Sequence, residues 1–560
     1  MGTDALIAQL ERIAADLGAG GGVAVQLERP RNPDHGDYAT NLALLLGGRL
    51  KQPPRQIAES IVARIDLAEA GVKSAEVAGP GFINFRLTAG RVQARILEIL
   101  QADRAWGRSE AGRGRRVQVE FVSANPTGPL HVAHGRGAAL GDGIASLLSH
   151  TGHDVEREFY VNDAGVQIDR LAESLEARWL ELNGTPTPVP EGGYHGDYVK
   201  ELAAGVESDM GGELRRMERA ERLRVLRQRA ITLLREEQDR DLRDFGVHFD
   251  SYFSETALYE TNRLQETLEE LDRAGLTYES EGALWLRTSS FGDDKDRVLV
   301  KGDGSYTYFL PDIAYHRDKA RRGFQHVIDV WGADHHGYVP RMQAVLRALG
   351  MPDFLDVEIV QMVRIVRGGQ EVKLSKRAGD IVTLRDLVAE TGPDVARYFF
   401  LMRRGDTQML FDLDLALDHS EKNPVYKVQY AHARMCSIFR RAGVEPRDVG
   451  PDTDVTPLVD ALEHDLVKEL VRYPEVVARA AEARAPHMVC DYLEGMAGMV
   501  NSWYHAGNPN RNPALAVLVP DEGLRRARLC LVRAVQITLR NGLELLGLRA
   551  PERMQREEPG

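Results

Sequence analysis

A strand, a tight turn and a helix are predicted between Glu120 and Gly143, where the sequence reads EFVSANPTGPLHVAHGRGAALGDG. The run Asn-Pro-Thr-Gly-Pro marks the turn, and the helix after it carries His131 and His134 on one face. Donor groups at the start of a helix suit the oxygen atoms of a polyphosphate. An HxxH pair alone is more often two surface histidines that cap a helix. The glycines on both sides reverse that preference, because they let a ligand approach the backbone closely.

Strands and helices alternate from Val117 to about Asp418, a pattern typical of a parallel, doubly wound sheet. The strands expected in this sheet are VQVEFVS, VEREFYV, HVIDVWG and VEIVQMVRIV. Between about Asp163 and Gly282 the alternation is interrupted by helical sequence, including a long charged helix at 214–246. We interpret this stretch as an insertion with a solvated arginine face. The spacing of GRGAALG is a weak match to a dinucleotide-binding loop, and we assign its small residues to helix packing.

The regions on either side of this α/β domain have different patterns. The first 112 residues predict a small α+β domain, with strands at 23–27 and 77–87 and helices at 38–50, 54–65 and 91–102. From about Asn423 onward, four long amphipathic segments predict an all-α helix bundle. The fold class is therefore α/β, with a doubly wound, Rossmann-like catalytic domain at 113–420. The other expected parts are an N-terminal α+β domain at 1–112, a helical insertion near 165–282 and a helical domain at 421–560.

Composition narrows the classes of function. The three cysteines, Cys436, Cys490 and Cys530, lie far apart, which argues against a disulfide framework or a cysteine zinc site and favours a cytoplasmic location. The net charge of −13 argues against unspecific coating of nucleic acid, although local basic patches stay compatible with a shaped RNA interface. No stretch approaches the roughly 20 apolar residues of a membrane span. We therefore expect no membrane association.

Two further segments would complete a site for a nucleoside triphosphate. Lys373 and Lys376 lie in the glycine-flanked loop GGQEVKLSKRAGD, from which they could swing onto phosphates, although a basic loop is usually only solvated. Gly332, Asp334 and His335 follow a hydrophobic strand in VWGADHHG, where a carboxylate suits a ribose. Asp-His-His also resembles the motif of the DHH phosphoesterases, a metal-binding alternative, but the further aspartates of that family are not apparent. Histidines, a helix start and lysines together indicate chemistry on ATP.

A cationic substrate is indicated by Glu120, Asn125, Tyr308 and Asp312. Two carboxylates, an amide and a phenol suit a planar guanidinium, which prefers carboxylate partners in a fork. The alternative for Asp312 is that it only caps the helix that continues as IAYHRDKARR.

Together these motifs resemble those of the class I aminoacyl-tRNA synthetases, with HVAH similar to their HIGH motif and KLSKR similar to their KMSKS motif. More narrowly, the chain resembles the arginyl-tRNA synthetases in the segments HGDYATN, AGPGFINF, REFYVNDAG, YFLPD, WGADHHGYV and NPVYKVQYAHAR. The resemblance covers essentially the whole chain. It is specific because so many motifs occur in one order.

The resemblance implies a two-step ligase reaction. L-Arginine attacks the α-phosphate of ATP to give arginyl-adenylate and pyrophosphate, and the arginyl group then passes to the terminal adenosine of tRNA(Arg), releasing AMP. Catalytic roles are implied for His131, His134, Lys373 and Lys376. ATP binding is implied for Thr127, Gly128, His131, His134, Gly135, Gly332, Asp334, His335 and Lys376, and arginine binding for Glu120, Ser123, Asn125, Tyr308 and Asp312. The HIGH-motif region comprises Ala124, Asn125, Pro126, Thr127, Gly128, Pro129, Leu130, His131, Val132, Ala133 and His134.

The resemblance also implies the partners of the protein. Magnesium would accompany ATP, and no tightly bound prosthetic group or structural zinc is expected. The N-terminal domain would contact the tRNA elbow and the C-terminal bundle the anticodon, in a monomer that binds no DNA. Arginine activation would require bound tRNA. A non-catalytic tRNA-binding relative is the remaining alternative, and the presence of both histidines and both lysines argues against it.

The chain departs from the family motifs at a few positions. Ala133 replaces the glycine of HIGH, while Leu374 and Arg377 replace the methionine and the last serine of KMSKS. Many arginyl enzymes lack the second lysine of this loop and carry a lysine just ahead of the histidine motif. Here Gly128 occupies that upstream position and Lys376 is present. We therefore expect Lys376 to neutralise the pyrophosphate, with help from Lys373.

Overall fold

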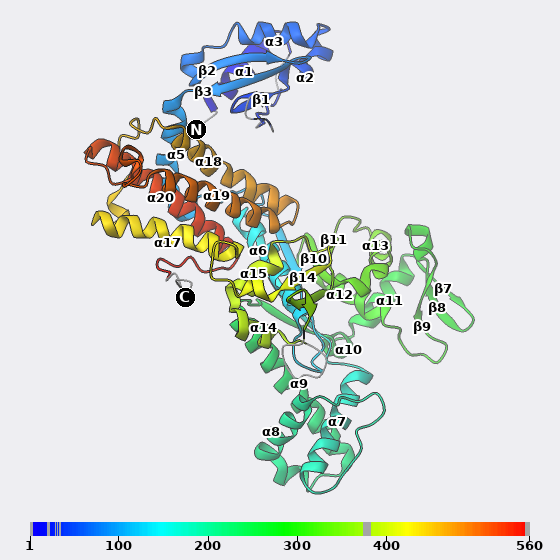
Figure 1. Cartoon of the computed structure of the whole chain (residues 1–560). Helices are drawn as coiled ribbons and strands as arrows, with labels where there is room; N and C mark the ends of the chain where they lie inside the picture. Colours follow the sequence, from blue (N-terminus) through cyan, green and yellow to red (C-terminus); the bar gives the residue numbers. More distant parts are fainter. Residues whose placement is uncertain are drawn as a thin grey trace. The chain divides into compact units, whose positions relative to one another are not determined.

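The computed structural model of the chain describes residues 4–19, 23–28, 30, 32, 35–372 and 382–554 (Figure 1). Contacts divide the chain into two compact units. Unit 1 comprises residues 1–106, 434–473 and 498–538, and unit 2 comprises residues 107–433, 474–497 and 539–560. Each unit therefore gathers segments that are distant in the sequence.

Unit 2 is built on a five-stranded parallel sheet with the strand order β11-β10-β4-β5-β6. The strands are β4 (Arg116–Glu120), β5 (Asp154–Val161), β6 (Ser251–Ser254), β10 (His326–Gly332) and β11 (Leu355–Val360). The chain adds β5 and β6 on one side of β4, then returns to place β10 and β11 on the other side. This order confirms the predicted doubly wound sheet, and it reverses between β4 and β10.

Two features of the sheet differ from the expectation. The segment VEIVQMVRIV was expected to be one strand, but it forms β11 and, after a break at Gln361 and Met362, β12 (Val363–Arg367) in a separate sheet. At the break, the backbone N–H of Gln361 donates to the carbonyl of Gly405 at 2.9 Å. Strand β6 lies inside the range 165–282, which was expected to be helical, and it pairs with β5 at the edge of the sheet.

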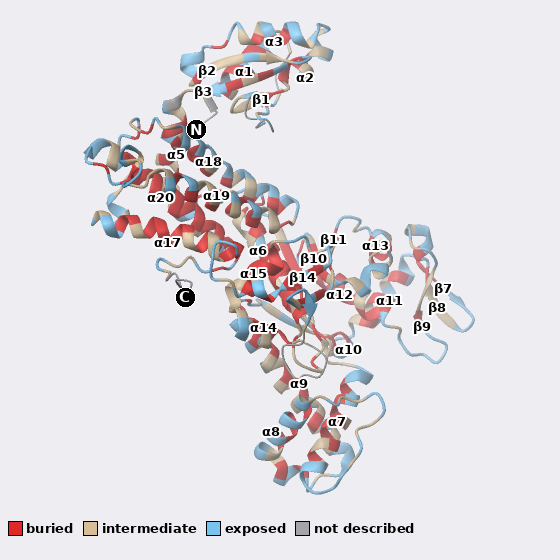
Figure 2. Ribbon diagram, in the orientation of Figure 1, coloured by how far each residue is buried: buried red, intermediate tan, exposed pale blue. Residues whose placement is uncertain are grey.

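Helix α6 (Val132–His150) follows β4 and packs closely on its neighbours. A Cβ atom at Gly141 would lie 2.2 Å from Cγ of Phe121, and one at Gly135 would lie 2.6 Å from Cδ1 of Leu384. Larger residues at these positions would push the helix away from the sheet. Figure 2 shows α6 and α15 (Pro393–Leu401) as largely buried. The small residues of GRGAALG thus serve packing, as predicted.

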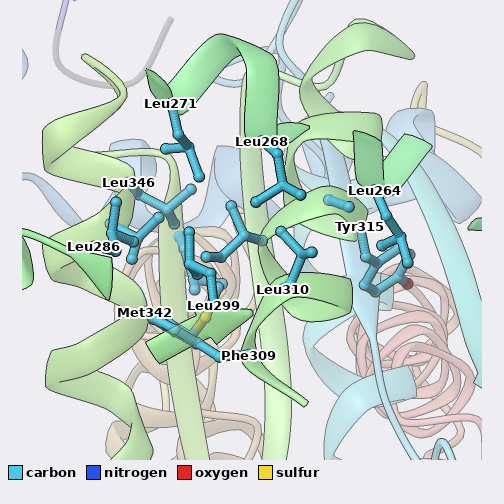
Figure 3. Packing of buried hydrophobic residues seen from close by; sticks show 14 of the residues in the cluster. Leu264, Leu268, Leu271, Leu286, Leu299, Phe309, Leu310, Tyr315, Met342 and Leu346 are labelled. Carbon is cyan, nitrogen blue, oxygen red and sulfur yellow. The ribbon is translucent and has the colours of Figure 1, made fainter. Parts of the chain in front are cut away.

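A second core packs several elements on β10 and β11. These elements are α10 (Thr256–Glu260), α11 (Arg263–Arg273), α12 (Phe309–Arg321), α13 (Val339–Ala348) and the antiparallel sheet of β7 (Thr277–Ser280), β8 (Ala283–Leu286) and β9 (Arg297–Val300). Leu268, Leu310 and Met342 belong to this core, together with Val327 of β10 and Leu355 of β11 (Figure 3). The packing holds α12, which carries several candidate site residues, against the sheet.

Three helices lie between β5 and β6, namely α7 (Val166–Leu182), α8 (Asp197–Leu214) and α9 (Arg219–Asp244). They share a small core of their own that includes Leu175, Trp179, Val206 and Leu234. The charged helix expected at 214–246 is interrupted at residues 215–218, where α8 ends and α9 begins.

A small three-stranded sheet with the order β13-β12-β14 follows the parallel sheet along the chain. Its further elements are β13 (Gln370–Glu371), α14 (Leu384–Thr391), α15, β14 (Met409–Asp412) and α16 (Leu413–Ala416). The segment with Lys373 and Lys376 follows β13 in the sequence, and both lysines lie outside the described residues.

The N-terminal part of unit 1 forms an antiparallel sheet with the order β1-β3-β2 and a separate core. Its elements are α1 (Asp4–Asp16), β1 (Tyr38–Thr40), α2 (Leu42–Leu50), α3 (Pro54–Val62), α4 (Leu67–Ala70), β2 (Val72–Ala78), β3 (Phe82–Leu87) and α5 (Ala89–Ala102). The helix expected at 38–50 begins only at Leu42, because Tyr38–Thr40 pairs with β3. The strand expected at 77–87 is a hairpin of β2 and β3. Within 23–28 only Glu28 forms a bridge, to Ala39, in place of the expected strand.

Four long helices confirm the predicted helical C-terminal region. They are α17 (Pro424–Ala442), α18 (Ala461–Glu482), α19 (His487–Ala506) and α20 (Glu522–Leu545). Cys436, Cys490 and Cys530 are all buried. Among the described residues, no helix combines the length and the apolar character that crossing a membrane requires.

Candidate active site

The carboxyl ends of β4 and β10 border a cavity of about 230 Å³. The strand order reverses between these two strands, and ligands of open α/β sheets usually bind at such a reversal. Its lining includes Glu120 and Ser123 from the end of β4, Tyr160 of β5, Asp312 and Tyr315 of α12, Asp329 of β10, and Tyr338. The cavity therefore combines aromatic rings with carboxylates.

Three carboxylates lie side by side across this end of the sheet. Glu120 of β4 is in register with Asp329 of β10 on one side and with Glu158 of β5 on the other. All three side chains are buried. Because buried like charges repel one another, such a row requires cations nearby.

Helix α12 supplies the first cation, Lys319, which is fully buried. Its Nζ lies 2.6 Å from Oε2 of Glu120 and 2.9 Å from Oδ1 of Asp329. Burial alone would lower the pKa of Lys319, but Asp329, Glu120 and Glu158 together raise it above its ordinary value. Lys319 is therefore an ammonium that binds one carboxylate from each of two neighbouring strands.

Other residues of α12 and its C-cap bind the remaining carboxylate oxygens. Arg322 donates from Nη2 to Oε1 of Glu158 at 2.9 Å, and the hydroxyl of Tyr315 donates to the same oxygen at 2.5 Å. Nε2 of His316 lies 3.0 Å from Oδ2 of Asp329. Side chains from one face of α12 and from its C-cap therefore bind all three carboxylates of the row.

Asp312, in the first turn of α12, is a further carboxylate of the cavity wall. Neither Lys319 nor Arg322 binds it. The hydroxyl of Tyr338 donates to its Oδ2. Burial, with smaller contributions from nearby Glu255 and Glu120, raises the pKa of Asp312 to about 6. The row of three acids and Asp312 make four carboxylates, which meet two basic side chains here, Lys319 and Arg322. Such a cavity favours a cationic ligand.

The backbone after β4 has an uncommon conformation. Val122 and Ser123 have φ angles of 68° and 40°, a region that non-glycine residues enter at a cost of about 1–3 kcal/mol each. This bend places Oγ of Ser123 where it donates to Oε1 of Glu120 at 2.9 Å and accepts from the N–H of Tyr160 at 3.1 Å. The strained backbone thereby holds a hydroxyl and a carboxylate at the cavity wall.

The same connection between β4 and α6 ends in the two histidines. His131 is the N-cap of α6 and His134 lies in its first turn, and their rings stack with centroids 3.6 Å apart. The backbone N–H of His131 donates to Nδ1 of His134 at 3.3 Å, and the N–H of His134 donates to Nδ1 of His131 at 3.4 Å. Since each Nδ1 accepts, each neutral ring carries its proton on Nε2.

Both histidines are held in the neutral form. Burial lowers the pKa of His131, and burial together with repulsion from His131 lowers the pKa of His134 to about 3. At neutral pH the start of α6 therefore presents two Nε2–H donors and the positive end of the helix dipole. That arrangement suits phosphate oxygens.

The turn between Ser123 and His131 is held by the insertion. Asn125 donates from Nδ2 to Oε1 of Gln167 at 2.9 Å. The carbonyl of Thr127 accepts from the hydroxyl of Tyr198 at 2.6 Å. Gln238 binds the carbonyls of Asn125 and Gly128. The three partners come from α7, α8 and α9 in turn.

Backbone hydrogen bonds anchor the chain on either side of residues 373–381, and the later anchor lies at His131. Before this segment, the N–H of Val372 donates to the carbonyl of Ile365 in β12 at 3.0 Å. After it, Thr383 forms an antiparallel bridge with His131, and the N–H of Val132 donates to the carbonyl of Val382 at 3.1 Å. Lys373 and Lys376 lie between these anchors in the sequence, outside the described residues.

Some residues expected to bind arginine lie away from the cavity. Glu120, Ser123 and Asp312 line it, but Tyr308 does not, and its side chain is 86% exposed. Tyr308 is the N-cap residue of α12 and is exposed, whereas Asp312 in the first turn lines the cavity. Asn125 lies in the turn rather than in the cavity wall.

Of the residues expected to bind ATP, some line the cavity and others lie outside it. Gly332 and His335 line the cavity. The side chain of Asp334 is largely exposed, and its Oδ1 lies 3.3 Å from Nδ1 of His335. Thr127 belongs to the turn, and Gly135 is packed against Leu384.

Sequence reasoning missed Lys319, Asp329, Glu158 and Tyr338. Asp329 gave a usable signal, because a charged residue in the middle of the apolar strand HVIDVWG requires a buried partner. Lys319 gave a misleading one, because it lies in the charged run HRDKARR, which has the composition of a solvated helix face.

Three family models match this chain. Residues 4–87 match the arginyl-tRNA synthetase N-terminal domain, residues 95–399 match the catalytic domain of class I tRNA synthetases (R), and residues 428–554 match the DALR anticodon-binding domain. The matches follow one another in the order expected from the sequence.

Known proteins are similar over nearly the whole length. The arginine–tRNA ligase of Geobacillus kaustophilus is 49% identical over 533 residues, which are 95% of this chain and 94% of that protein. The arginine–tRNA ligase of Bacillus subtilis is 47% identical over 532 residues, with the same coverage of 95% and 94%. The solved structure of Thermus thermophilus arginyl-tRNA synthetase matches with a TM-score of 0.76 and 25% identity, covering 99% of this chain and 100% of that one.

Proposed function

Because this chain belongs to the arginyl-tRNA synthetase family, we infer that the anionic cavity between β4 and β10 binds the arginine substrate of the family's reaction. The protein is an arginine–tRNA ligase, which activates L-arginine with ATP and transfers the arginyl group to tRNA(Arg). The observation that carries the assignment is the excess of carboxylates in a buried cavity, because no other common amino acid side chain is a permanent planar cation.

We propose that Asp312 binds the guanidinium. Tyr338 donates to one carboxylate oxygen of Asp312, a residue of the cavity wall, and the other oxygen would accept from the guanidinium. Glu120 and Ser123 lie at the end of β4, where they would orient the amino acid together with Asn125. Tyr308 would contribute only after its exposed ring turns toward the cavity.

In the proposed first step, a carboxylate oxygen of arginine bonds to the α-phosphorus of ATP. The bond from that phosphorus to the bridging oxygen breaks, and pyrophosphate leaves with the electron pair. His131 and His134 would donate from Nε2–H to the α-phosphate oxygens as negative charge develops there. No side chain acts as a covalent nucleophile. Gly332 and His335 would contact the nucleoside, and magnesium would enter with ATP on its phosphate oxygens.

Lys376 is proposed to neutralise the departing pyrophosphate. It lies six residues before Val382 in the sequence, so it is at most about 20 Å from the segment beside His131. Replacing Lys376 with Ala should lower the rate of arginine-dependent pyrophosphate exchange by about 10²-fold. The Lys373→Ala variant is the matched control, with a smaller loss. Undiminished exchange in the Lys376→Ala variant would show that another group neutralises the pyrophosphate.

The reaction itself is tested by ATP–pyrophosphate exchange with each amino acid, with and without bulk tRNA. Exchange with arginine alone, and only when tRNA is added, is the expected result. Exchange with a different amino acid would contradict the assignment of the cavity. Full exchange without tRNA would contradict the proposed tRNA requirement alone.

Arginine binding should depend on pH through Asp312. The guanidinium prefers the ionised carboxylate, whereas in the free protein burial holds the pKa of Asp312 at about 6. Below that pH the ligand must displace a proton, so the dissociation constant should rise about tenfold between pH 7 and pH 5. Titration calorimetry at several pH values measures this change. The Asp312→Asn variant should bind weakly at every pH in the range, and an equal pH dependence in that variant would assign the effect to another group.

The remaining expectations are proposals about partners. We propose that residues 1–112 contact the tRNA elbow, that residues 421–560 contact the anticodon, and that the protein works as a cytoplasmic monomer. The match of residues 428–554 to an anticodon-binding domain supports the second of these. Light scattering after size-exclusion chromatography tests the monomer directly.

A further inference from the structure

Gln238 is a fully buried amide on α9, the helix whose sequence RAERLRVLRQRAITLLREEQDRDLRD is dominated by charged residues. Its Nε2 donates to the carbonyl of Asn125 at 3.1 Å and to the carbonyl of Gly128 at 3.0 Å. Both acceptors belong to one turn, more than a hundred residues earlier in the chain. The two donors of this amide are thus used on a single distant loop.

That turn has few bonds of its own. Within it, the N–H of Thr127 donates to the carbonyl of Asn125 at 2.7 Å. The carbonyls of Asn125 and Gly128 accept from Gln238, and the carbonyl of Thr127 accepts from Tyr198. Backbone carbonyls away from water require such partners. The insertion therefore determines where the turn lies relative to α6.

Helix α9 also binds α14, the helix that begins beside His131. Arg385 of α14 donates to Oδ1 of Asp241 and to Oε1 of Glu237, both at 2.8 Å. The N-cap of α14 is Thr383, which forms the bridge with His131. One stretch of α9 thus contacts both of the segments between which His131 lies.

We propose that Gln238, with Tyr198, is a positioning residue for ATP: it fixes the turn at residues 125–128 so that the turn and His131 meet the phosphates. This inference rests on the proposed function, because it takes that turn and the histidines as the phosphate site. It adds a role for the insertion, whose charged helix has the composition of a solvated surface. Misplacing a binding group by about 1 Å can cost 10²-fold in rate.

The test compares Gln238→Leu and Tyr198→Phe with Gln228→Leu. Gln228 is exposed on the same helix, which makes it the matched control. Steady-state pyrophosphate exchange at saturating tRNA gives kcat and KM for ATP, calorimetry without ATP gives the arginine dissociation constant, and thermal unfolding reports stability.

The Gln238→Leu variant should lose about 10- to 100-fold in kcat/KM for ATP, with a clearly smaller loss of arginine affinity through Asn125. The Tyr198→Phe variant should change the same parameter less, and Gln228→Leu should change nothing. Lower melting temperatures of Gln238→Leu and Tyr198→Phe with wild-type kcat and KM for ATP would overturn the proposal. Equal losses in kcat/KM for ATP and in arginine affinity would overturn it as well. A wild-type protein without arginine-dependent exchange would instead contradict the proposed function.

Discussion

A protein in which His134 is replaced by Asn should fold normally and lose about 10²–10³-fold in the rate of arginine-dependent pyrophosphate exchange. The Oδ1 atom of Asn can take the place of Nδ1, which accepts the backbone N–H of His131 at 3.3 Å. The cap of α6 therefore remains. What the variant lacks is the Nε2–H donor that we propose for the reacting phosphate.

The His134→Gln variant tests the donor of this side chain. Gln at the third residue of a helix can accept the backbone N–H of the N-cap, so the capping box of α6 can persist. The variant should therefore unfold at the wild-type temperature and retain more activity than His134→Asn, because its amide can donate from near the Nε2 position. Wild-type exchange rates in His134→Asn would mean that this histidine only caps the helix.

Replacing Lys319 with Met should destabilise the protein by about 3–5 kcal/mol, because it leaves two buried carboxylates without a counter-ion. Met has nearly the length of Lys, so little packing is lost. Nζ of Lys319 lies within 2.9 Å of both Glu120 and Asp329, and its side chain is fully buried. Urea denaturation of the wild type and the variant measures the difference in the free energy of unfolding.

The deficit of the Lys319→Met variant should shrink as the pH falls. Without the ammonium, the pKa values of the two carboxylates rise in the folded state. The folded variant then binds more protons than the unfolded chain, and low pH favours it. The control is Lys200→Met, which removes an exposed ion pair with Asp197 and should leave stability unchanged. A Lys319→Met variant as stable as the wild type would show that the row of acids does not need this cation.

Much of the architecture is predictable from local sequence patterns. The alternation of apolar runs and helical segments predicts the parallel sheet, and the four long amphipathic segments predict the C-terminal helices. The misplaced boundaries have identifiable reasons. VEIVQMVRIV has uniform strand character, so nothing local reveals that the chain leaves the sheet at Gln361. Strand β6 has only four residues, too few to stand out among helices.

Part of the candidate site is likewise predictable from local sequence, and part depends on how distant segments pack. The histidines lie in one motif, so the start of α6 is predictable from the sequence. The acid row depends on strand register, which places Asp329 beside Glu120 although they are distant in the sequence. Lys319 acquires its role only when α12 packs on that register. For Tyr308 the motif indicates the residue type but not the direction of the side chain.

The division of unit 1 along the chain has a consequence for its synthesis. Helix α5 leaves the ribosome early, but the residues that complete its surroundings are made late. Gln93 donates to the carbonyl of Thr456 at 3.2 Å, and Arg533 lies 3.4 Å from Asp103. Translation adds about 5–20 residues per second, so the interval from residue 103 to residue 456 takes about 20–70 s. During this time α5, whose Ile96 and Ile99 are buried in the folded protein, lacks the late segments that bind Gln93 and Asp103. A nascent chain paused in this interval should bind chaperones through α5, and only the last quarter of the protein releases them.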